Sequence, residues 1–232
     1  MGDVTTAPRE DVPTRKSDAA YETLKGLVLN GRIRPGRHLV LYDLAEHLKI
    51  GETPLRDAML RLATEGLLAR DNSSGFSTKE FRVDEQRQIL ELCDLMLTHA
   101  VLNAGDRVSG QLLTDLAELE NAPAATIEEA AQLAGRIRDM YLEIARAAGN
   151  DVLRDQCRVM VDRSHMVRML DLQIGESGRH TIDDLREFGV AMAAREVEQA
   201  VASVKAILGR RIDRLPLLVK EANFLASDAS FP

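Results

Sequence analysis

The chain has 232 residues, of which 45% are hydrophobic and 29% charged, and it has no Trp and a net charge of −7. This length suits two domains of ordinary size, and the composition is typical of packed amphipathic helices. No apolar run reaches the roughly 18–20 residues that span a bilayer, and Cys93 and Cys157 stand far apart within apolar helical patterns. We therefore expect a mainly α-helical, cytoplasmic protein with no membrane contact, in which both cysteines are small buried hydrophobes.

The acidic charge belongs to the second part of the chain. Residues 1–80 carry 12 Lys and Arg against 12 Asp and Glu, whereas the remaining 152 residues carry 18 against 25. The overall charge mildly opposes nucleic-acid binding. A neutral first part still binds phosphates, however, if its basic side chains cluster on one face.

The first 50 residues predict an arm, a helix, a turn and a short extended segment. Residues 1–16 mix Gly, Thr, Pro and charges without an apolar period, which predicts a disordered arm. A helix is expected from a cap at Ser17 or Asp18 to the Asn30-Gly31 pair. Pro35-Gly36 predicts a turn, and residues 38–41 are long enough to pair with a wing but not to make a sheet.

Two further helices and a hairpin follow. Helices are expected over residues 42–48 and from Thr53, with Thr53 as N-cap and Pro54 at the first helical position. The apolar residues of the later helix form one stripe: Leu55, Ala58, Met59, Leu62 and Ala63. Residues 67–70 and 76–79 predict two strands around the polar turn 71–75. This order of elements predicts a winged helix-turn-helix, a shape that fits DNA.

These residues resemble the DNA-binding domain of GntR-family transcription regulators over its whole length. The resemblance is carried by Tyr21-x-x-Leu24, Pro35-Gly36-x-x-Leu39, Leu44-Ala45-x-x-Leu48, Thr53-Pro54-Leu55-Arg56-Asp57-Ala58-Met59-x-Arg61-Leu62 and Gly75-Phe76. In that family the start of the third helix enters the major groove. The resemblance therefore implies that Thr53 and Arg56 face DNA and that Gly75 approaches the minor groove at the wing tip.

Several of these positions have two interpretations. Thr53 is otherwise only a helix cap and Arg56 only a solvated side chain, while Arg61 is either a phosphate contact or part of a surface ion pair. Glu52 stands where family members usually have Arg. A carboxylate accepts from cytosine N4 but cannot donate to guanine, so either the operator differs at that base or Glu52 points elsewhere. Tyr42 either donates its hydroxyl to a phosphate or packs its ring under the turn.

The rest of the chain predicts an all-α antiparallel helical bundle. Helices are expected over about residues 84–107, 109–120, 126–148, 150–172, 179–194 and 196–225, with short connections between them. The domain organisation is therefore an arm at 1–16, the winged domain at 17–80, a helical domain at 84–225, and a tail at 226–232.

This second domain resembles the FCD effector domain of the FadR subgroup of GntR regulators. The similarity lies in Glu85-x-Arg87-x-x-Leu90-Glu91, Ala147-Ala148-Gly149-Asn150-x-x-Leu153 and Ala200-x-x-x-Val204-x-x-x-Leu208. Most FCD domains bind a divalent metal through one Asp and three His. The matching positions here are Ile137, Tyr141, Leu185 and Ile207. None carries an imidazole or a carboxylate, so we expect neither metal nor cofactor. A shift of one turn would instead place Asp139 and Glu143 at the first pair.

Apolar residues at the ligand positions predict a more apolar pocket. Arg87 matches an FCD arginine that commonly faces the cavity, and Arg163 lies where another often does, which favours a small organic acid or an apolar effector. The alternative is that each arginine pairs with an acid, such as Glu91 one turn after Arg87. His99 and His165 are weaker candidates. The candidate pocket residues are Arg87, Tyr141, Arg163, Leu185 and Ile207.

The expected function is a homodimeric transcription regulator, acting as a repressor on a near-palindromic operator in double-stranded DNA and modulated by a small ligand. The alternative is a DNA-binding protein whose helical domain only dimerises. No nucleophile with a base, paired carboxylate motif or phosphate-binding glycine loop stands out, so we do not expect an enzyme.

Overall fold

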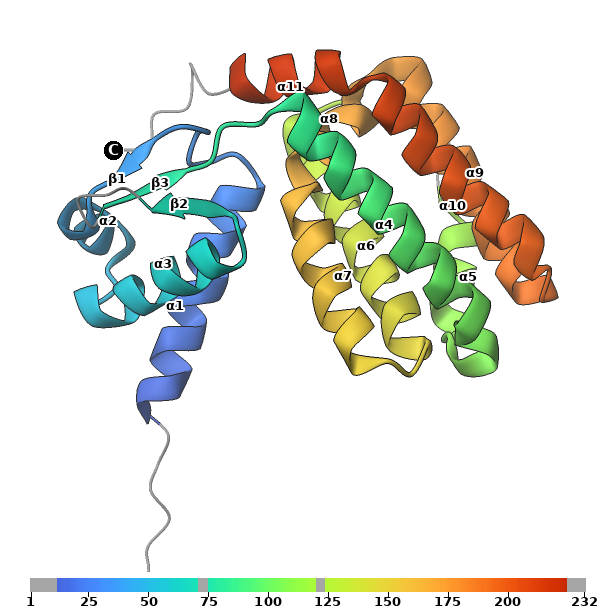
Figure 1. Ribbon diagram of the computed structural model, residues 1–232, viewed down its shortest axis with the longest axis horizontal. Helices are drawn as coiled ribbons and strands as arrows, with labels where there is room; N and C mark the ends of the chain where they lie inside the picture. Colours follow the sequence, from blue (N-terminus) through green and yellow to red (C-terminus); the bar gives the residue numbers. More distant parts are fainter. Residues whose placement is uncertain (1–11, 71–74, 120–123, 225–232) are drawn as a thin grey trace, which may run out of the picture.

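The computed structural model describes residues 12–70, 75–119 and 124–224, which form a small mixed domain beside a larger helical one (Figure 1). The described part of the first domain comprises α1 (Val12–Leu29), β1 (His38–Leu39), α2 (Leu41–Leu48), α3 (Glu52–Thr64), β2 (Leu68–Arg70) and β3 (Phe76–Thr78). The second comprises α4 (Val83–Ala104), a 3-10 turn (Gly105–Arg107), α5 (Gly110–Ala117), α6 (Ile127–Ala147), α7 (Asp151–Arg163), α8 (His165–Gln173), α9 (Gly175–Ala194), α10 (Val197–Asp213) and α11 (Leu215–Phe224).

The small sheet is the wing of a helix-turn-helix. Strand β3 pairs antiparallel with both β1 and β2, so that Leu39 lies opposite Phe76 and Ala69 lies opposite Ser77. This pairing confirms that the extended segment after the Pro35-Gly36 turn joins the wing. Gly36 has φ 73°, a left-handed backbone that suits glycine. The expected wing turn at residues 71–74 lies outside the described residues.

The core of the first domain lies between α1, α3 and the sheet. Helix α1 packs against α3, and the stripe predicted for α3 is buried. The buried residues that meet there are Ala20, Tyr21, Leu24, Leu55, Ala58, Met59 and Leu62. Their spacing of three or four residues gives each helix one apolar face, which fixes the direction in which its opposite face points.

Two helix starts differ from the sequence predictions. Helix α1 begins at Val12 rather than at Ser17, because Pro13 lies in the first turn, where its missing N–H is not needed. Helix α3 begins at Glu52, and its N-cap is Gly51 without a side-chain hydrogen bond. Thr53 is therefore not the cap, and Pro54 lies two positions deeper in the first turn than predicted. Residues 1–11 of the predicted arm lie outside the described residues.

The second domain is the predicted helical bundle. Helix α4 packs against α6, α7 and α10, while α9 packs against α5 and α10. These helices enclose one large apolar core that includes Leu97, Ile144, Phe188 and Leu208. Cys93 and Cys157 are free and buried, as predicted. Burial raises the pKa of the Cys93 thiol to about 12 and that of Cys157 to about 11. Both thiols therefore stay protonated and serve as small hydrophobes.

Three helix boundaries in the bundle differ from the predictions. The helix predicted over 150–172 is two helices, α7 and α8, which meet at Ser164. The helix predicted over 196–225 is likewise divided at Arg214, two residues before Pro216, which disfavours a continuous helix. Residues 175–178, which lie between the helices predicted over 150–172 and 179–194, form the first turn of α9, where Ser177 and Gly178 are buried. Tertiary packing overrides local propensity at this point.

A short connection ties the two domains together. Between β3 and α4, the backbone N–H of Phe81 donates to Asn223 Oδ1 on α11 at 3.0 Å, and Asn223 Nδ2 donates to the carbonyl of Phe81 at 2.9 Å. This reciprocal pair fixes the linker against the last helix. No helix in the described ranges is both long and apolar enough to cross a bilayer.

Candidate DNA-binding surface and effector domain

The start of α3 presents a row of polar side chains to solvent. Glu52, Thr53 and Arg56 are all exposed, whereas Leu55, Ala58, Met59 and Leu62 of the apolar stripe are buried. Because they occupy the first turn and a half, they lie where recognition helices contact base edges. Glu52 is also the acid of that first turn, where a carboxylate complements the positive end of the helix dipole.

Two further residues predicted on this surface, Tyr42 and Gly75, differ from each other in exposure. Tyr42, in the first turn of α2, is 64% exposed, which excludes the alternative that its ring packs under the turn. The ring therefore stands in solvent with its hydroxyl accessible. Gly75 is half-buried at the start of β3, directly after the wing residues outside the described range.

Arg61 forms ion pairs, as the second of its two interpretations predicted. Its Nη1 lies 3.2 Å from Asp18 Oδ1 of α1, and its Nε lies 3.8 Å from Glu65 Oε1 one turn later. The guanidinium also covers the ring of Tyr21, 3.6 Å from the centroid. Arg61 thus helps to hold α3 on α1.

A buried network joins the end of α3 to the helical domain. Glu65, which closes α3, accepts from Tyr21 Oη at 2.7 Å and from Arg158 Nη1 of α7 at 2.9 Å. Lys25 Nζ of α1 donates to Tyr21 Oη at 2.9 Å and lies 2.5 Å from Asp162 Oδ2 of α7. We call these five residues, Tyr21, Lys25, Glu65, Arg158 and Asp162, the interdomain clamp.

The clamp is buried and continues into the bundle. Only 3% of Lys25 and 2% of Asp162 are exposed. The other carboxylate oxygen of Asp162 accepts from Arg138 Nε of α6 at 2.5 Å. Burial lowers the pKa of Arg138, but the ion pair with Asp162 outweighs it, so that the pKa rises. One carboxylate therefore connects α1 of the DNA-binding domain with α6 and α7 of the bundle.

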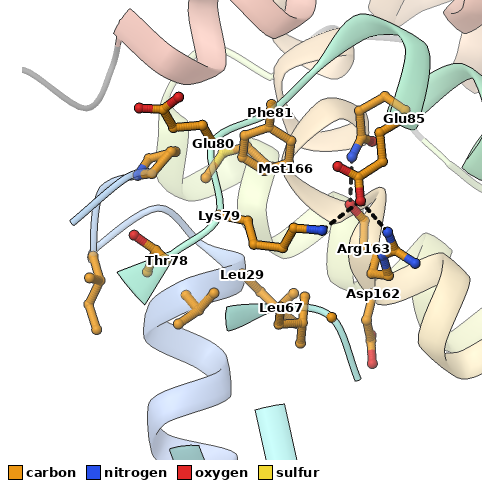
Figure 2. Close-up of a pocket in the computed structure, with 15 residues that line it drawn as sticks. Leu29, Leu67, Thr78, Lys79, Glu80, Phe81, Glu85, Asp162, Arg163 and Met166 are labelled. Carbon is orange, nitrogen blue, oxygen red and sulfur yellow. Dashed lines mark hydrogen bonds and ion pairs between the residues drawn. The ribbon is translucent and has the colours of Figure 1, made fainter. Parts of the chain in front are cut away.

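A second group of charges lies beside the linker, in a small cavity of about 40 Å³. Figure 2 shows Lys79 and Arg163 converging on the carboxylate of Glu85, with Lys79 Nζ at 2.6 Å. Burial alone would raise the pKa of Glu85, but its two cationic partners hold it below its usual value. Arg163 thus pairs with an acid at the domain boundary rather than facing an effector cavity, as the alternative interpretation predicted.

The other predicted pocket residues divide into two groups. Arg87 is exposed on α4, contrary to the prediction that it faces the cavity, because the buried face of α4 carries Gln86, Ile89 and Leu90 instead. Tyr141, Leu185 and Ile207 are buried in the bundle core, as are the other residues of the apolar cluster around them. The structure thus brings together the apolar candidates and leaves both predicted arginines outside the group.

The described residues contain no group of three or more His, Cys, Asp or Glu that could hold a metal ion. The shifted pair also lacks a third ligand, since Asp139 pairs with Arg138 at 2.8 Å and Glu143 accepts from the backbone N–H of Ser109 at 3.0 Å. The donor set does not fit a divalent metal. That the domain binds no metal remains a prediction.

Sequence reasoning did not identify a cluster of buried charges around α8. All residues from His165 to Leu172 are buried, and this run includes Arg168 and Asp171. Asp171 accepts from Arg211 Nε at 3.2 Å, Arg214 Nε at 2.9 Å and Ser177 Oγ at 2.7 Å. The signal was present in the sequence: an arginine and an aspartate interrupt the apolar run 166–172, and charges in a fully buried helix need partners.

Known proteins resemble the chain along both domains. Residues 16–77 match the family of bacterial regulatory proteins, gntR family, and residues 87–210 match the FCD domain. The Nta operon transcriptional regulator of Aminobacter aminovorans is 24% identical over 198 residues, covering 84% of this chain and 92% of that protein. The transcriptional regulator McbR of Escherichia coli K12 is 33% identical over 99 residues, 41% of this chain and 43% of McbR.

Solved structures share the fold. The structure of E. coli McbR/YncC has a TM-score of 0.65 at 22% identity, covering 87% of this chain and 97% of that one. A putative GntR transcriptional regulator from Rhodococcus sp. RHA1 has a TM-score of 0.70 at 17% identity, covering 88% and 98%. The winged domain with its exposed recognition helix and the two family matches agree. The chain belongs to the GntR family and is a DNA-binding transcription regulator with an FCD domain, not an enzyme.

Proposed function

We propose that this protein is a cytoplasmic repressor of the FadR subgroup, which binds a near-palindromic operator as a homodimer and whose DNA affinity a small ligand in the helical domain modulates. The observation that carries the DNA part is the exposed group Glu52, Thr53 and Arg56 at the start of α3, a helix whose buried stripe packs in the core of the domain. A two-fold dimer presents two such helices and therefore favours an operator with two-fold symmetry.

Each residue of this surface has a distinct proposed role. Arg56 donates to a guanine and Thr53 contacts the neighbouring base or phosphate in the major groove. Glu52 accepts from cytosine N4, which makes the operator of this protein differ from those read by an arginine at that place. Tyr42 donates its exposed hydroxyl to a phosphate, and Gly75 lets the wing approach the minor groove closely.

Exposed leucines support the homodimer. Leu92, Leu95 and Leu102 of α4 are 42%, 68% and 58% exposed. Their spacing of three and seven residues places them on one face of the helix. Helix α4 lies on the outside of the bundle (Figure 1). Exposed leucines that share one helix face are typical of a surface that another subunit covers. A second copy of the chain would bury these leucines in an isologous contact, as a two-fold operator requires.

The interdomain clamp favours a function in which a ligand modulates DNA binding. It gives less support to the alternative, in which the helical domain only dimerises. Glu65 closes the recognition helix and bonds directly to α7, so a displacement of α7 acts on α3 through one side chain. A ligand changes the affinity of the protein for DNA only to the extent that the ligand itself binds one arrangement of the two domains more tightly than the other. The interdomain clamp contacts both the recognition helix and the bundle, so it links the DNA-binding surface to a ligand site in the helical domain.

Selection of DNA from random pools by the purified protein tests the DNA part of the proposal. We expect a sequence with two related half-sites and a cytosine where Glu52 lies. Arg56→Ala should weaken binding to the selected DNA by roughly 1–3 kcal/mol, because it removes a base contact. Arg186→Ala, at an exposed position of α9, is the matched control and should bind as the wild type does. Unchanged affinity of Arg56→Ala would exclude this role for Arg56.

A further inference from the structure

An open groove of about 530 Å³ lies between the end of α3 and helix α7. Its walls come from both domains, with lining residues between positions 61 and 66 on one side and between positions 156 and 163 on the other. The volume is within the roughly 300–1,000 Å³ of sites that hold small molecules. The groove is therefore large enough for a ligand that contacts both domains at once.

Three arginines line this groove and meet around Glu65 and Gly66. Arg158 Nη1 donates to Glu65 Oε1 at 2.9 Å, and Arg61 Nε lies 3.8 Å from the same oxygen. Arg163 lies against Gly66, since a Cβ added to that glycine would be 3.3 Å from Arg163 Nε. Among the described residues of the lining, Glu65 is the one acid. Three guanidinium groups thus converge where the lining provides a single carboxylate.

The acids beyond the lining leave the arginines available for a further acceptor. Arg61 pairs with Asp18, but the two side chains are 48% and 62% exposed, and a surface pair of this kind stabilises little. Arg163 pairs with Glu85, which Lys79 also binds at 2.6 Å (Figure 2). If an anion drew the arginines towards it, Asp18 would be hydrated and Glu85 would keep Lys79.

The guanidinium groups also have donors to offer. Arg158 donates from Nη1 to Glu65 and Tyr21, and Arg163 donates from Nη2 to Glu85. These bonds use one terminal nitrogen of each guanidinium, whereas a guanidinium carries five N–H groups. Two N–H groups on one edge of a guanidinium match two oxygens of a phosphate. The groove therefore presents more N–H groups than Glu65 can accept from.

We propose that this groove, which we call the arginine groove, binds the diphosphate group of a nucleotide through Arg61, Arg158 and Arg163. The arginines come from both walls, so two linked phosphates reach more of them than one phosphate does. The chain as a whole carries a net charge of −7, which repels anions. A phosphorylated ligand therefore binds where arginines gather rather than elsewhere on this surface.

The rest of the lining favours a nucleotide over a bare diphosphate. Val159 and Met160 are half-buried in the same groove. A thioether makes favourable contacts with aromatic rings, and a base offers such a ring. Thr64 and Gln156 are exposed lining residues and supply polar groups at the edge. The groove thus combines positive charge for the phosphates with an apolar surface for the base.

The arginine groove shares two residues with the interdomain clamp, Glu65 and Arg158. A nucleotide that accepts from Arg158 competes with Glu65 for the same guanidinium, so occupancy of the groove and the arrangement of the two domains are linked. The site lies outside the helical core and takes a phosphorylated ligand, so it goes beyond the proposed function and does not depend on a ligand within the bundle.

Titration calorimetry with the full-length protein in EDTA tests the site. The probes are ADP, AMP, pyrophosphate and adenosine at constant ionic strength. We expect one ADP per chain, weaker binding of AMP and pyrophosphate, and no binding of adenosine. Arg61→Lys and Arg158→Lys should each weaken ADP binding roughly tenfold, because lysine keeps the charge but loses the fork that bonds two phosphate oxygens.

The matched control is Arg154→Lys, one turn before Arg158 on α7. Arg154 pairs with Asp151 and Asp155 instead of lining the groove, and this variant should bind ADP as the wild type does. All three variants keep the net charge, so a general attraction of phosphates to the protein would not distinguish them. The side chain of Arg61 is 48% exposed, so Arg61→Lys should melt as the wild type does and decides the test even if Arg158→Lys is less stable.

Four results would overturn the inference. They are that neither ADP nor pyrophosphate binds, that adenosine binds as tightly as ADP, that Arg61→Lys binds ADP as the wild type does, or that Arg154→Lys loses as much affinity as the site variants. If both site variants weaken DNA binding while the wild type binds no ADP, the arginines serve the DNA backbone instead. Failure to select an operator, with ADP binding intact, would refute only the proposed function.

Discussion

His165 lies between two groups of buried charges, and its own charge state follows from them. Burial is the main reason that a protonated imidazole is disfavoured, and repulsion from Arg168 of α8, Arg138 of α6 and Lys25 of α1 adds to it. The pKa of His165 therefore lies well below the usual value of about 6.5 in the folded protein. The ring is neutral, and its Nδ1 accepts from Arg168 in the tautomer that the contact requires.

This depressed pKa predicts a loss of stability in mild acid. Below about pH 6.5 the unfolded chain binds a proton at His165 that the folded chain does not bind, so the free energy of unfolding falls as the pH falls. One such proton gives a slope of about 1.4 kcal/mol per pH unit. Urea denaturation between pH 7.5 and 5.5 should show the wild type approaching this slope only at the acid end, because the unfolded imidazole is half protonated at about pH 6.5, and His165→Gln should show a flatter profile.

His99→Gln is the control for this measurement, because His99 is exposed on α4. That variant should keep the wild-type slope. If His99→Gln and His165→Gln flatten the profile equally, then the buried imidazole is not the source of the pH dependence.

Helix α4 illustrates how one element serves two surfaces. Its buried face, which includes Leu90, Leu97 and Ala100, forms part of the bundle core. Its outer face carries Leu92, Leu95 and Leu102, which are 42%, 68% and 58% exposed. The seven-residue recurrence of leucine on that face was visible in the sequence, but only the packing of the bundle distinguishes it from the core face.

We predict that Leu95→Asp weakens the homodimer at least tenfold. A charge placed in an apolar interface has to be desolvated without a partner, which costs several kcal/mol. Light scattering during size-exclusion chromatography should show monomer at concentrations where the wild type is dimeric. The matched control is Val190→Asp on α9, which replaces an apolar residue of similar exposure, 58%, and should remain dimeric. A dimeric Leu95→Asp variant would place the interface elsewhere.

At the scale of the whole molecule, the clamp makes the two domains one cooperative unit. Lys25, Glu65 and Asp162 are buried although they lie at the boundary between domains, because each covers the others. Asp162 bridges Lys25 from one domain and Arg138 from the other. Figure 1 shows α7, which carries Asp162 and Arg158, on the side of the bundle that faces the winged domain.

Asp162→Asn should therefore make the two domains unfold independently of each other. The substitution removes the buried acid that bridges Lys25 and Arg138, and breaking a buried pair in this way costs about 3–5 kcal/mol. Calorimetry should show one unfolding transition for the wild type and two for the variant. Asp139→Asn also removes a partner of Arg138, but this carboxylate is 72% exposed, so we expect a loss of at most about 1 kcal/mol. Equal losses in the two variants would contradict the role of the clamp.

The sequence by itself determined the winged domain and the class of the second domain. The apolar stripe of α3, the turn at Pro35-Gly36 and the hairpin are local patterns, and local patterns survive tertiary packing because the residues that form them are neighbours in the chain. The absence of imidazole and carboxylate at Ile137, Tyr141, Leu185 and Ile207 is likewise a fact of the sequence.

The tertiary structure decided which charges meet. Arg87 and Arg163 were predicted to face the cavity, yet one is exposed and the other pairs with Glu85, while Arg168 and Arg211 are the arginines in the core. The rotation of each helix about its axis and the breaks at Ser164 and Arg214 determine this outcome. Both depend on how several helices pack together, and contacts as distant as Glu65 to Arg158 or Asp171 to Arg211 leave no periodic trace in the sequence.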